Sequence, residues 1–240
     1  MATRFPPVSR ALVLILFGVF GCGSDLLLPD PPGGGDNVEL SKVDGDQQVG
    51  VVGERLEQPL VVKVMTARDL PATGREVDFV FTSAAGVVTP AKAVTNSEGE
   101  ATANWVLGTE PGHQTVAARL VVGDAEPQTE EFTAEARPAA PDTLSAKSPT
   151  SQPGRRGHKV AAPPVIQVVD RFGNPVPEVP VAWQVSSGEG KVSEAITRTN
   201  GDGLSTVDWT LGPRVGIQRL TATVGPITGS PLSFTATVLF

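Results

Sequence analysis

The chain of 240 residues contains one stretch of sequence twice. Residues 95–108, TNSEGEATANWVLG, match residues 199–212, TNGDGLSTVDWTLG, at an offset of 104 residues (199 − 95). The same offset holds without a gap from Pro59 to Arg119 in the first copy. A repeat of about 100 residues has the size of a whole domain. The sequence therefore predicts two copies of one domain in tandem.

Within each copy, apolar residues recur at every second position, which is the period of a β-strand with one buried face. The alternation is clear in residues 101–107 and again in residues 205–211. Gly, Pro, Asn and Asp interrupt the runs about every 8–12 residues, as in a β-sandwich. The 26 Gly and 22 Pro also disfavour helices. The sequence predicts an all-β fold with these inward-facing residues: Leu60, Val62, Val64, Val77, Phe79, Phe81, Ala101, Ala103, Trp105, Leu107, Phe132, Ala134, Ala136, Pro164, Ile166, Val168, Val181, Trp183, Val185, Ser205, Val207, Trp209, Leu211, Phe234, Ala236 and Val238.

Residues 170–192, DRFGNPVPEVPVAWQVSSGEGKV, with the TNGDGLSTVDWTLG that follows, resemble a group-1 bacterial immunoglobulin-like domain of the type in invasin and intimin. The first copy departs at one turn, where ARDLPATGREV lacks Gly-Asn-Pro-Val but keeps Pro71 and Val77. The resemblance covers about residues 38–240 and implies two tandem immunoglobulin-like β-sandwich domains. It leaves the function open, because the family includes spacers, adhesin stalks and domains of no known role.

The first 21 residues combine a basic head, Arg4 and Arg10, with an apolar core from Ala11 to Phe20. About ten apolar residues are too few for a membrane-spanning helix, which needs about 20. This pattern is typical of a secretory signal peptide. The alternative is a buried strand or helix of a cytosolic domain.

Val19-Phe20-Gly21-Cys22 resembles the lipobox of bacterial lipoproteins, although Phe20 is larger than the residue usual at that position. The resemblance implies that the Cys22 thiol is diacylated, that the chain is cut before Cys22, and that the new amino terminus is acylated. Several acyl chains hold a protein firmly at a membrane. Cys22 is also the one cysteine of the chain, so no intramolecular disulfide can form. The alternative is an ordinary signal peptide with an incidental cysteine.

These features predict four segments: a signal peptide over 1–21, the lipidated Cys22 and a Pro/Gly-rich flexible tether over 22–37, a first domain over 38–137 and a second domain over 138–240. The tether contains both stiffening prolines and loosening glycines. In the lipoprotein family, the Gly that follows the cysteine here implies sorting to the outer membrane. The surface and periplasmic faces of that membrane stay open.

No arrangement of residues for catalysis or cofactor binding stands out, so we predict no catalytic residue, no cofactor and no metal. His113 and His158 fall in turn-like contexts and fit neither a His-plus-nucleophile arrangement nor a metal-ligand spacing. Four further residues sit in turns, where their side chains bond to the local backbone. The alternative is a calcium site, although the ligand series of a calcium loop is missing. These four residues are Asp170, Asn174, Asn200 and Asp202.

The formal net charge of −7 becomes −9 when Arg4 and Arg10 leave with the signal peptide (−7 − 2). This acidic balance opposes nucleic-acid binding. Arg155-Arg156 is a small basic spot that we interpret as a solvated loop. Tyr is absent, and the alternation places all three Trp on inward faces, so an aromatic platform for sugars is poorly supported.

The sequence therefore predicts a cell-envelope outer-membrane lipoprotein, anchored through Cys22, that is not an enzyme. Its tandem domains would form a structural, adhesive or spacer module for an unknown protein or carbohydrate ligand. The alternative is a periplasmic or surface protein that binds carbohydrate or assists assembly. A polar, pocket-free surface favours the first function, and exposed aromatic side chains in a shallow groove favour the second.

Overall fold

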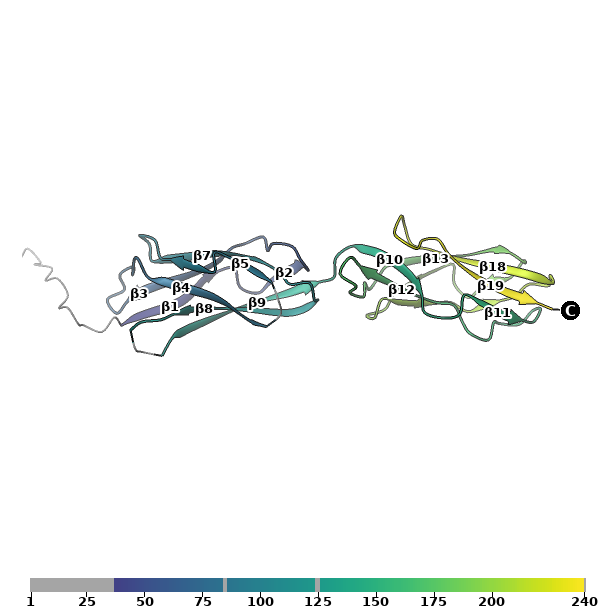
Figure 1. Ribbon diagram of the computed structural model, residues 1–240, viewed down its shortest axis with the longest axis horizontal. Coiled ribbons are helices and arrows are strands. Elements are labelled where there is room, and N and C mark those ends of the chain that lie inside the picture. Colours follow the sequence, from purple (N-terminus) through teal and green to yellow (C-terminus); the bar gives the residue numbers. More distant parts are fainter. Residues whose placement is uncertain (1–36, 84–85, 124–125, 240) are drawn as a thin grey trace, which may run out of the picture. The chain divides into compact units, whose positions relative to one another are not determined.

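The structure is a computed structural model that describes residues 37–83, 86–123 and 126–239. The predicted signal peptide, Cys22 and the tether up to residue 36 lie outside these described residues. The regular secondary structure of the described residues consists of β-strands alone, which confirms the all-β prediction (Figure 1). The strands pair only within residues 38–137 or within residues 141–238. They form two sandwiches, each with its own hydrophobic core.

The first sandwich contains the strands β1 (Val38–Asp44), β2 (Gln48–Val51), β3 (Leu60–Thr66), β4 (Glu76–Ser83), β5 (Val87–Thr89), β6 (Lys92–Val94), β7 (Glu100–Val106), β8 (Gly112–Leu120) and β9 (Gln128–Arg137). One sheet has the order β1-β3-β7-β5, and the facing sheet has the order β2-β9-β8-β4-β6. Neighbouring strands are antiparallel except for β2 and β9, which run parallel. The alternating apolar residues of both sheets point into the space between them.

The second sandwich contains β10 (Pro141–Ala146), β11 (Ser151–Gly154), β12 (Val165–Asp170), β13 (Pro180–Ser187), β14 (Lys191–Val192), β15 (Ile196–Arg198), β16 (Leu204–Thr206), β17 (Trp209–Thr210), β18 (Gly216–Thr223) and β19 (Leu232–Val238). A sheet β10-β12-β16 and a pair β14-β17 face the sheet β11-β19-β18-β13-β15. β11 and β19 are neighbours in the larger sheet, and they are its first and last strands in chain order. They run parallel, as β2 and β9 do in the first sandwich.

One strand of the first sandwich is divided in the second. β7 is continuous, whereas the equivalent stretch of the second copy forms the two short strands β16 and β17. In the first copy Leu60 pairs with Ala103. The second copy has Pro164 at the position of Leu60, and proline has no N–H to donate to a sheet. β12 therefore begins only at Val165, and the contact of Val207 N with Pro164 O is stretched to 3.4 Å.

The predicted inward-facing residues form the two cores. All of them are buried except Phe81 and Val185, which are half-buried at the edges of their cores. Trp105 and Trp209 are both 0% exposed and occupy equivalent positions. This confirms that the alternation marks the buried face of each sheet, and that both tryptophans are core residues. Burying one large apolar side chain contributes about 1.5–3 kcal/mol to stability.

Candidate functional site

The repeated Thr-Asn-x-x-Gly motif forms a structural turn in both copies. In the second copy the Asn200 Oδ1 accepts hydrogen bonds from the backbone N–H groups of Asp202, at 3.0 Å, and Leu204, at 2.9 Å. Asn96 makes the equivalent bonds in the first copy. The preceding threonine is also engaged, since the buried Thr199 hydroxyl donates to the Val176 carbonyl at 2.7 Å. This turn uses the side chain of Asn200 internally, as an Asx turn does.

The carboxylate of Asp170 is likewise engaged in hydrogen bonds to the turn that follows β12. Its Oδ1 accepts from the backbone N–H groups of Phe172, at 2.8 Å, and Asn174, at 2.9 Å. Its Oδ2 accepts from the Ala139 N–H at 3.0 Å and from the Asn174 side-chain amide at 2.9 Å. Asp170 is 2% exposed. These bonds support the interpretation of Asp170 and Asn174 as turn residues, because both carboxylate oxygens already have donors.

The hydrogen bonds around Asp170 predict an acid-sensitive contribution to stability. Burial by itself raises the pKa of Asp170, but the donors from Asn174, Ala139 and Phe172 outweigh it and hold the pKa below the ordinary 3.8. A lowered pKa stabilises the fold fully above the ordinary value and loses this effect as pH falls through the lowered one. We expect Asp170→Asn to destabilise the second sandwich by about 1–3 kcal/mol at neutral pH.

The difference between wild type and Asp170→Asn should shrink as both are melted at successively lower pH, down to about pH 2, because the wild-type carboxyl takes up a proton as the pH falls through its lowered pKa. Asp202→Asn is the matched control, because Asp202 lies in an exposed turn of the same sandwich. A difference in melting temperature that stays constant down to that pH would contradict the assigned role of Asp170.

The two histidines lie apart, one in each sandwich. His113 is exposed at the start of β8 rather than in a turn, and its Nδ1 lies 3.0 Å from Glu135 Oε2. His158 is exposed in the turn after β11. Within residues 37–83, 86–123 and 126–239, no group of three or more His, Cys, Asp and Glu is placed to hold a metal ion. The histidines thus contribute to no common site.

All three tryptophans are buried, as the alternation predicts. Trp183 donates its indole N–H to the Thr197 hydroxyl at 2.7 Å. The indole N–H groups of Trp105 and Trp209 have no hydrogen-bond partner among the described residues. Among the described residues, Phe172 is the one exposed aromatic side chain. The Arg171 guanidinium lies 4.7 Å from the centre of its ring. The tryptophans therefore offer no stacking surface to a sugar.

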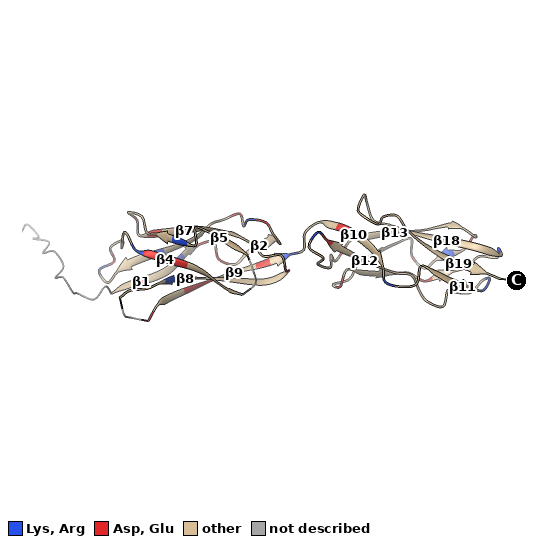
Figure 2. Ribbon diagram, in the orientation of Figure 1, with Lys and Arg blue, Asp and Glu red and all other residues tan. Residues whose placement is uncertain are grey.

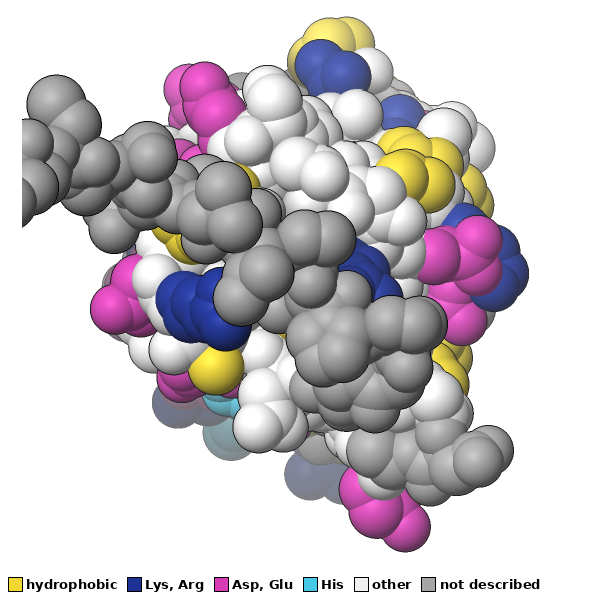
Figure 3. Space-filling view, turned by 90° about the vertical axis from the view of Figure 1, so that its left-hand side faces the viewer, with side chains coloured by type: hydrophobic (Ala, Val, Ile, Leu, Met, Phe, Trp, Pro, Cys, Tyr) yellow, Lys and Arg dark blue, Asp and Glu magenta, His cyan; other side chains and the backbone are white. Residues whose placement is uncertain are grey.

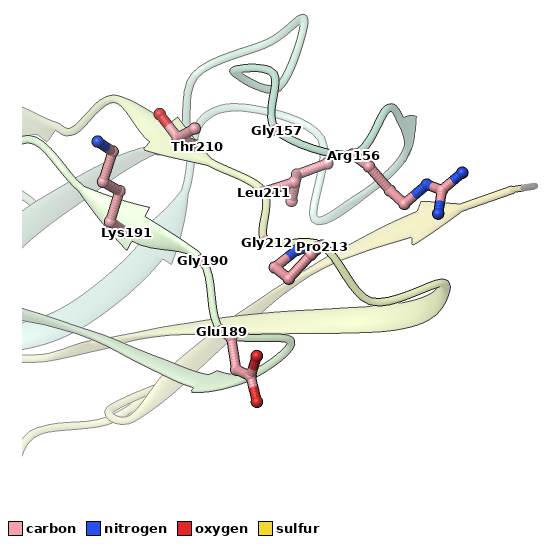
Figure 4. Close-up of a pocket in the computed structure, with 9 residues that line it drawn as sticks. All are labelled: Arg156, Gly157, Glu189, Gly190, Lys191, Thr210, Leu211, Gly212 and Pro213. Carbon is pink, nitrogen blue, oxygen red and sulfur yellow. The ribbon is translucent and has the colours of Figure 1, made fainter.

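An open hollow of about 590 Å³ lies at the end of the second sandwich, where three loops meet (Figure 4). The loop after β17 forms one wall and is held by Gln218, which is buried in β18. The Gln218 Oε1 accepts from Gly212 N at 2.8 Å, and its Nε2 donates to Arg214 O at 2.8 Å. The alignment of Gln114 with Gln218 indicates a shared role for the two residues, but only the structure shows that they hold this loop. The hollow is lined by Arg156, Gly157, Glu189, Gly190, Lys191, Thr210, Leu211, Gly212 and Pro213.

Charged side chains of both signs also occur on the surface outside this hollow. On the face seen in Figure 3, dark blue and magenta side chains alternate among white ones. In the first sandwich, for example, Lys92 lies 2.6 Å from Glu76 and 2.8 Å from Asp78. No helix of the described residues is long and apolar enough to cross a membrane.

Comparison with solved structures identifies the architecture. The FdeC adhesin of Escherichia coli matches with a TM-score of 0.57 and 18% sequence identity, over 85% of this chain and 64% of that one. The fold is that of tandem immunoglobulin-like domains. InvD of Yersinia pseudotuberculosis is 17% identical with a TM-score of 0.48, over 84% of this chain and 57% of that one. The D0-D1 domain of intimin is 17% identical with a TM-score of 0.32, over 82% and 94%.

No family model and no curated protein matches the sequence. The structure confirms the tandem immunoglobulin-like fold that the DRFGNPV and TNGDG motifs predict. At sequence identities of 17–18%, the similarity to the solved structures concerns the fold alone. The chain spans about two thirds of the FdeC structure, at 64%. The function of these modules has to be argued from the chain itself.

Proposed function

We propose that this protein is a cell-envelope lipoprotein, anchored through acylated Cys22, whose two immunoglobulin-like sandwiches form an adhesive or structural module. The observation that carries the proposal is the succession of a lipobox-like Val19–Cys22 motif and two copies of a fold shared with the FdeC adhesin. A stable sandwich at the end of a tether presents loops and strand edges to a partner. Binding and catalytic residues are commonly placed on loops that a rigid scaffold positions.

The hydrogen bonds and burial of the candidate side chains support a binding or structural role over an enzymatic one. Asp170, Asn200 and the three tryptophans are spent on turns and cores. An active site instead brings a nucleophile, a base and a group that orients the base within hydrogen-bond reach of one another. The outer membrane is the proposed location, and the partner is a protein or carbohydrate of the envelope or of a neighbouring cell.

The test of the anchor is Cys22→Ala in cells that express the full chain. We expect the wild-type protein in the membrane fraction and the variant in the soluble fraction, because the acyl chains supply the membrane affinity. Ser24→Ala is the matched control, since it changes a neighbouring small residue and leaves the thiol in place. Membrane retention of Cys22→Ala would overturn the lipoprotein assignment.

Protease treatment of intact cells then tests the adhesive role. Loss of the second sandwich when protease is added to cells with an intact envelope supports exposure at the surface and a partner outside the cell. Survival of the sandwich until the envelope is broken supports a structural role inside the envelope and contradicts adhesion.

A further inference from the structure

The two sandwiches carry opposite balances of charge although they share one fold. Residues 38–137 contain 8 Lys and Arg against 16 Asp and Glu, whereas residues 141–239 contain 9 against 7. Figure 2 shows blue ribbon beside β11 and β19 of the second sandwich. In this acidic chain, the second sandwich is therefore the part to which an anionic ligand would be attracted.

Cations of the second sandwich line three adjoining hollows. The hollow of Figure 4 includes Arg156 and Lys191. A second hollow of about 570 Å³ includes Arg155 and Lys159. A third, of about 320 Å³, includes both Lys159 and Lys191 and so connects the other two. We call this continuous surface the basic groove and define it by Arg155, Arg156, Lys159 and Lys191.

Most of the positive charge of the basic groove is uncompensated. Arg155, Arg156 and Lys191 are exposed, and no carboxylate among the described residues forms an ion pair with them. Lys159 does have a partner, Asp208. Three cations are thus available to a ligand, and the guanidinium groups among them can bind a carboxylate, sulfate or phosphate through two parallel hydrogen bonds.

The two acidic side chains that line the groove, Glu189 and Asp208, do not neutralise these three cations. Glu189 pairs with Arg214. In Figure 4, Arg156 and Lys191 extend on either side of the Leu211–Gly212 segment, while Glu189 points away from both. The centre of the groove therefore stays open between its cations.

The first sandwich shows that the fold does not require this charge. At the offset of 104 residues, the loop glycines of the groove are kept, so the backbone path is common to both copies. The three free cations are not kept, because Arg155, Arg156 and Lys191 stand where the first copy has Val51, Val52 and Val87. The first copy folds without these three cations, so the fold does not explain their presence in the second copy. Their presence there points to a ligand.

We propose that the basic groove binds an acidic polysaccharide through its carboxylate, sulfate or phosphate groups. A row of cations along connected hollows fits an extended chain with spaced anionic groups, whereas a flat bilayer cannot follow a concave surface. A small metabolite fits poorly, because specific small-molecule sites enclose most of their ligand. The choice of a polysaccharide over an acidic protein segment rests on the proposed function, since an envelope protein meets acidic glycans.

The test is binding of the full chain, purified in a non-ionic detergent, to polygalacturonate at low ionic strength. Neutral dextran, polyglutamate and vesicles containing phosphatidylglycerol are the comparison ligands. We expect polygalacturonate to bind at least as tightly as polyglutamate, dextran not to bind, and added salt to weaken binding by screening. The variant Arg155→Gln/Arg156→Gln/Lys191→Gln should bind polygalacturonate roughly tenfold more weakly, because it removes all three free cations.

The matched control is Arg55→Gln/Arg119→Gln/Lys147→Gln, which changes the net charge equally at exposed positions outside the groove. It should bind as the wild type does, and both variants should melt at the wild-type temperature. Equal losses in the two variants, or no loss in the groove variant, would overturn the site. Tighter binding to polyglutamate or to the vesicles than to polygalacturonate would overturn the ligand class. Because the assay uses purified protein, its outcome is independent of whether Cys22 anchors the chain.

Discussion

Trp209→Ala should destabilise the second sandwich by about 3–5 kcal/mol, which is the range for removing a large aromatic side chain from a core. Trp209 is 0% exposed and lies in the centre of its core, on the short strand β17. Its indole N–H has no partner among the described residues, so the substitution removes packing and breaks no hydrogen bond of the side chain. The expected loss is a large part of the stability of an ordinary domain.

Hydrogen exchange followed peptide by peptide is the appropriate measurement, because a protein with two cores need not unfold in one step. Protection should fall in peptides from residues 141–238 and stay unchanged in peptides from residues 38–137. Ile196→Ala is the control, since Ile196 is 64% exposed and its truncation should change stability by less than about 0.5 kcal/mol. Unchanged protection in Trp209→Ala would show that Trp209 does not support the core.

Gly203→Ala should also be strongly destabilising, by about 2–4 kcal/mol. Gly203 has a φ of +69°, where a side chain is strained, and a Cβ would lie 2.4 Å from the Val168 carbonyl oxygen. That oxygen belongs to the backbone of β12 and cannot move aside without disturbing the sheet. The first copy has the same restriction at Gly99, which has a φ of +76°.

The same turn supplies the control for Gly203→Ala. Gly201 lies two residues earlier, its φ is not in the left-handed region, and a Cβ there meets no atom within 4 Å. Gly201→Ala should therefore be neutral or slightly stabilising, because alanine reduces the freedom of the unfolded chain. Thermal melting of the two variants separates the predictions, and equal melting temperatures would contradict the assigned geometry.

The sandwich fold and its core were predictable because two independent patterns agree. Alternation marks one face of each strand, and the repeat marks the same face twice, as Trp105 and Trp209 show. Where alternation is lost, prediction is harder. β8 has buried Ala117 and Ala118 side by side, and alanine is small enough to be covered on either face of a sheet. β8 is therefore harder to recognise from sequence than β7 is.

The division of β16 from β17 needed knowledge of pairing. Pro164 keeps the apolar character of Leu60 and so fits the alternation, but its missing N–H matters only once the strand opposite is known. The basic groove was out of reach for a similar reason. The sequence shows Arg155-Arg156 as two neighbouring cations, and only the fold brings Lys191, on β14 and 35 residues later (191 − 156), to the same hollow.

The parallel pairing of β2 with β9, and of β11 with β19, determines how each sandwich would bear mechanical load. In both sandwiches a strand near the start of the domain lies beside the last strand and runs in the same direction, over Gln48–Val51 and over Ser151–Gly154. Tension that pulls the two ends of a sandwich apart slides such strands past each other. The hydrogen bonds between them are then loaded in shear together instead of opening one after another. Each sandwich is thereby built to resist extension along its own chain.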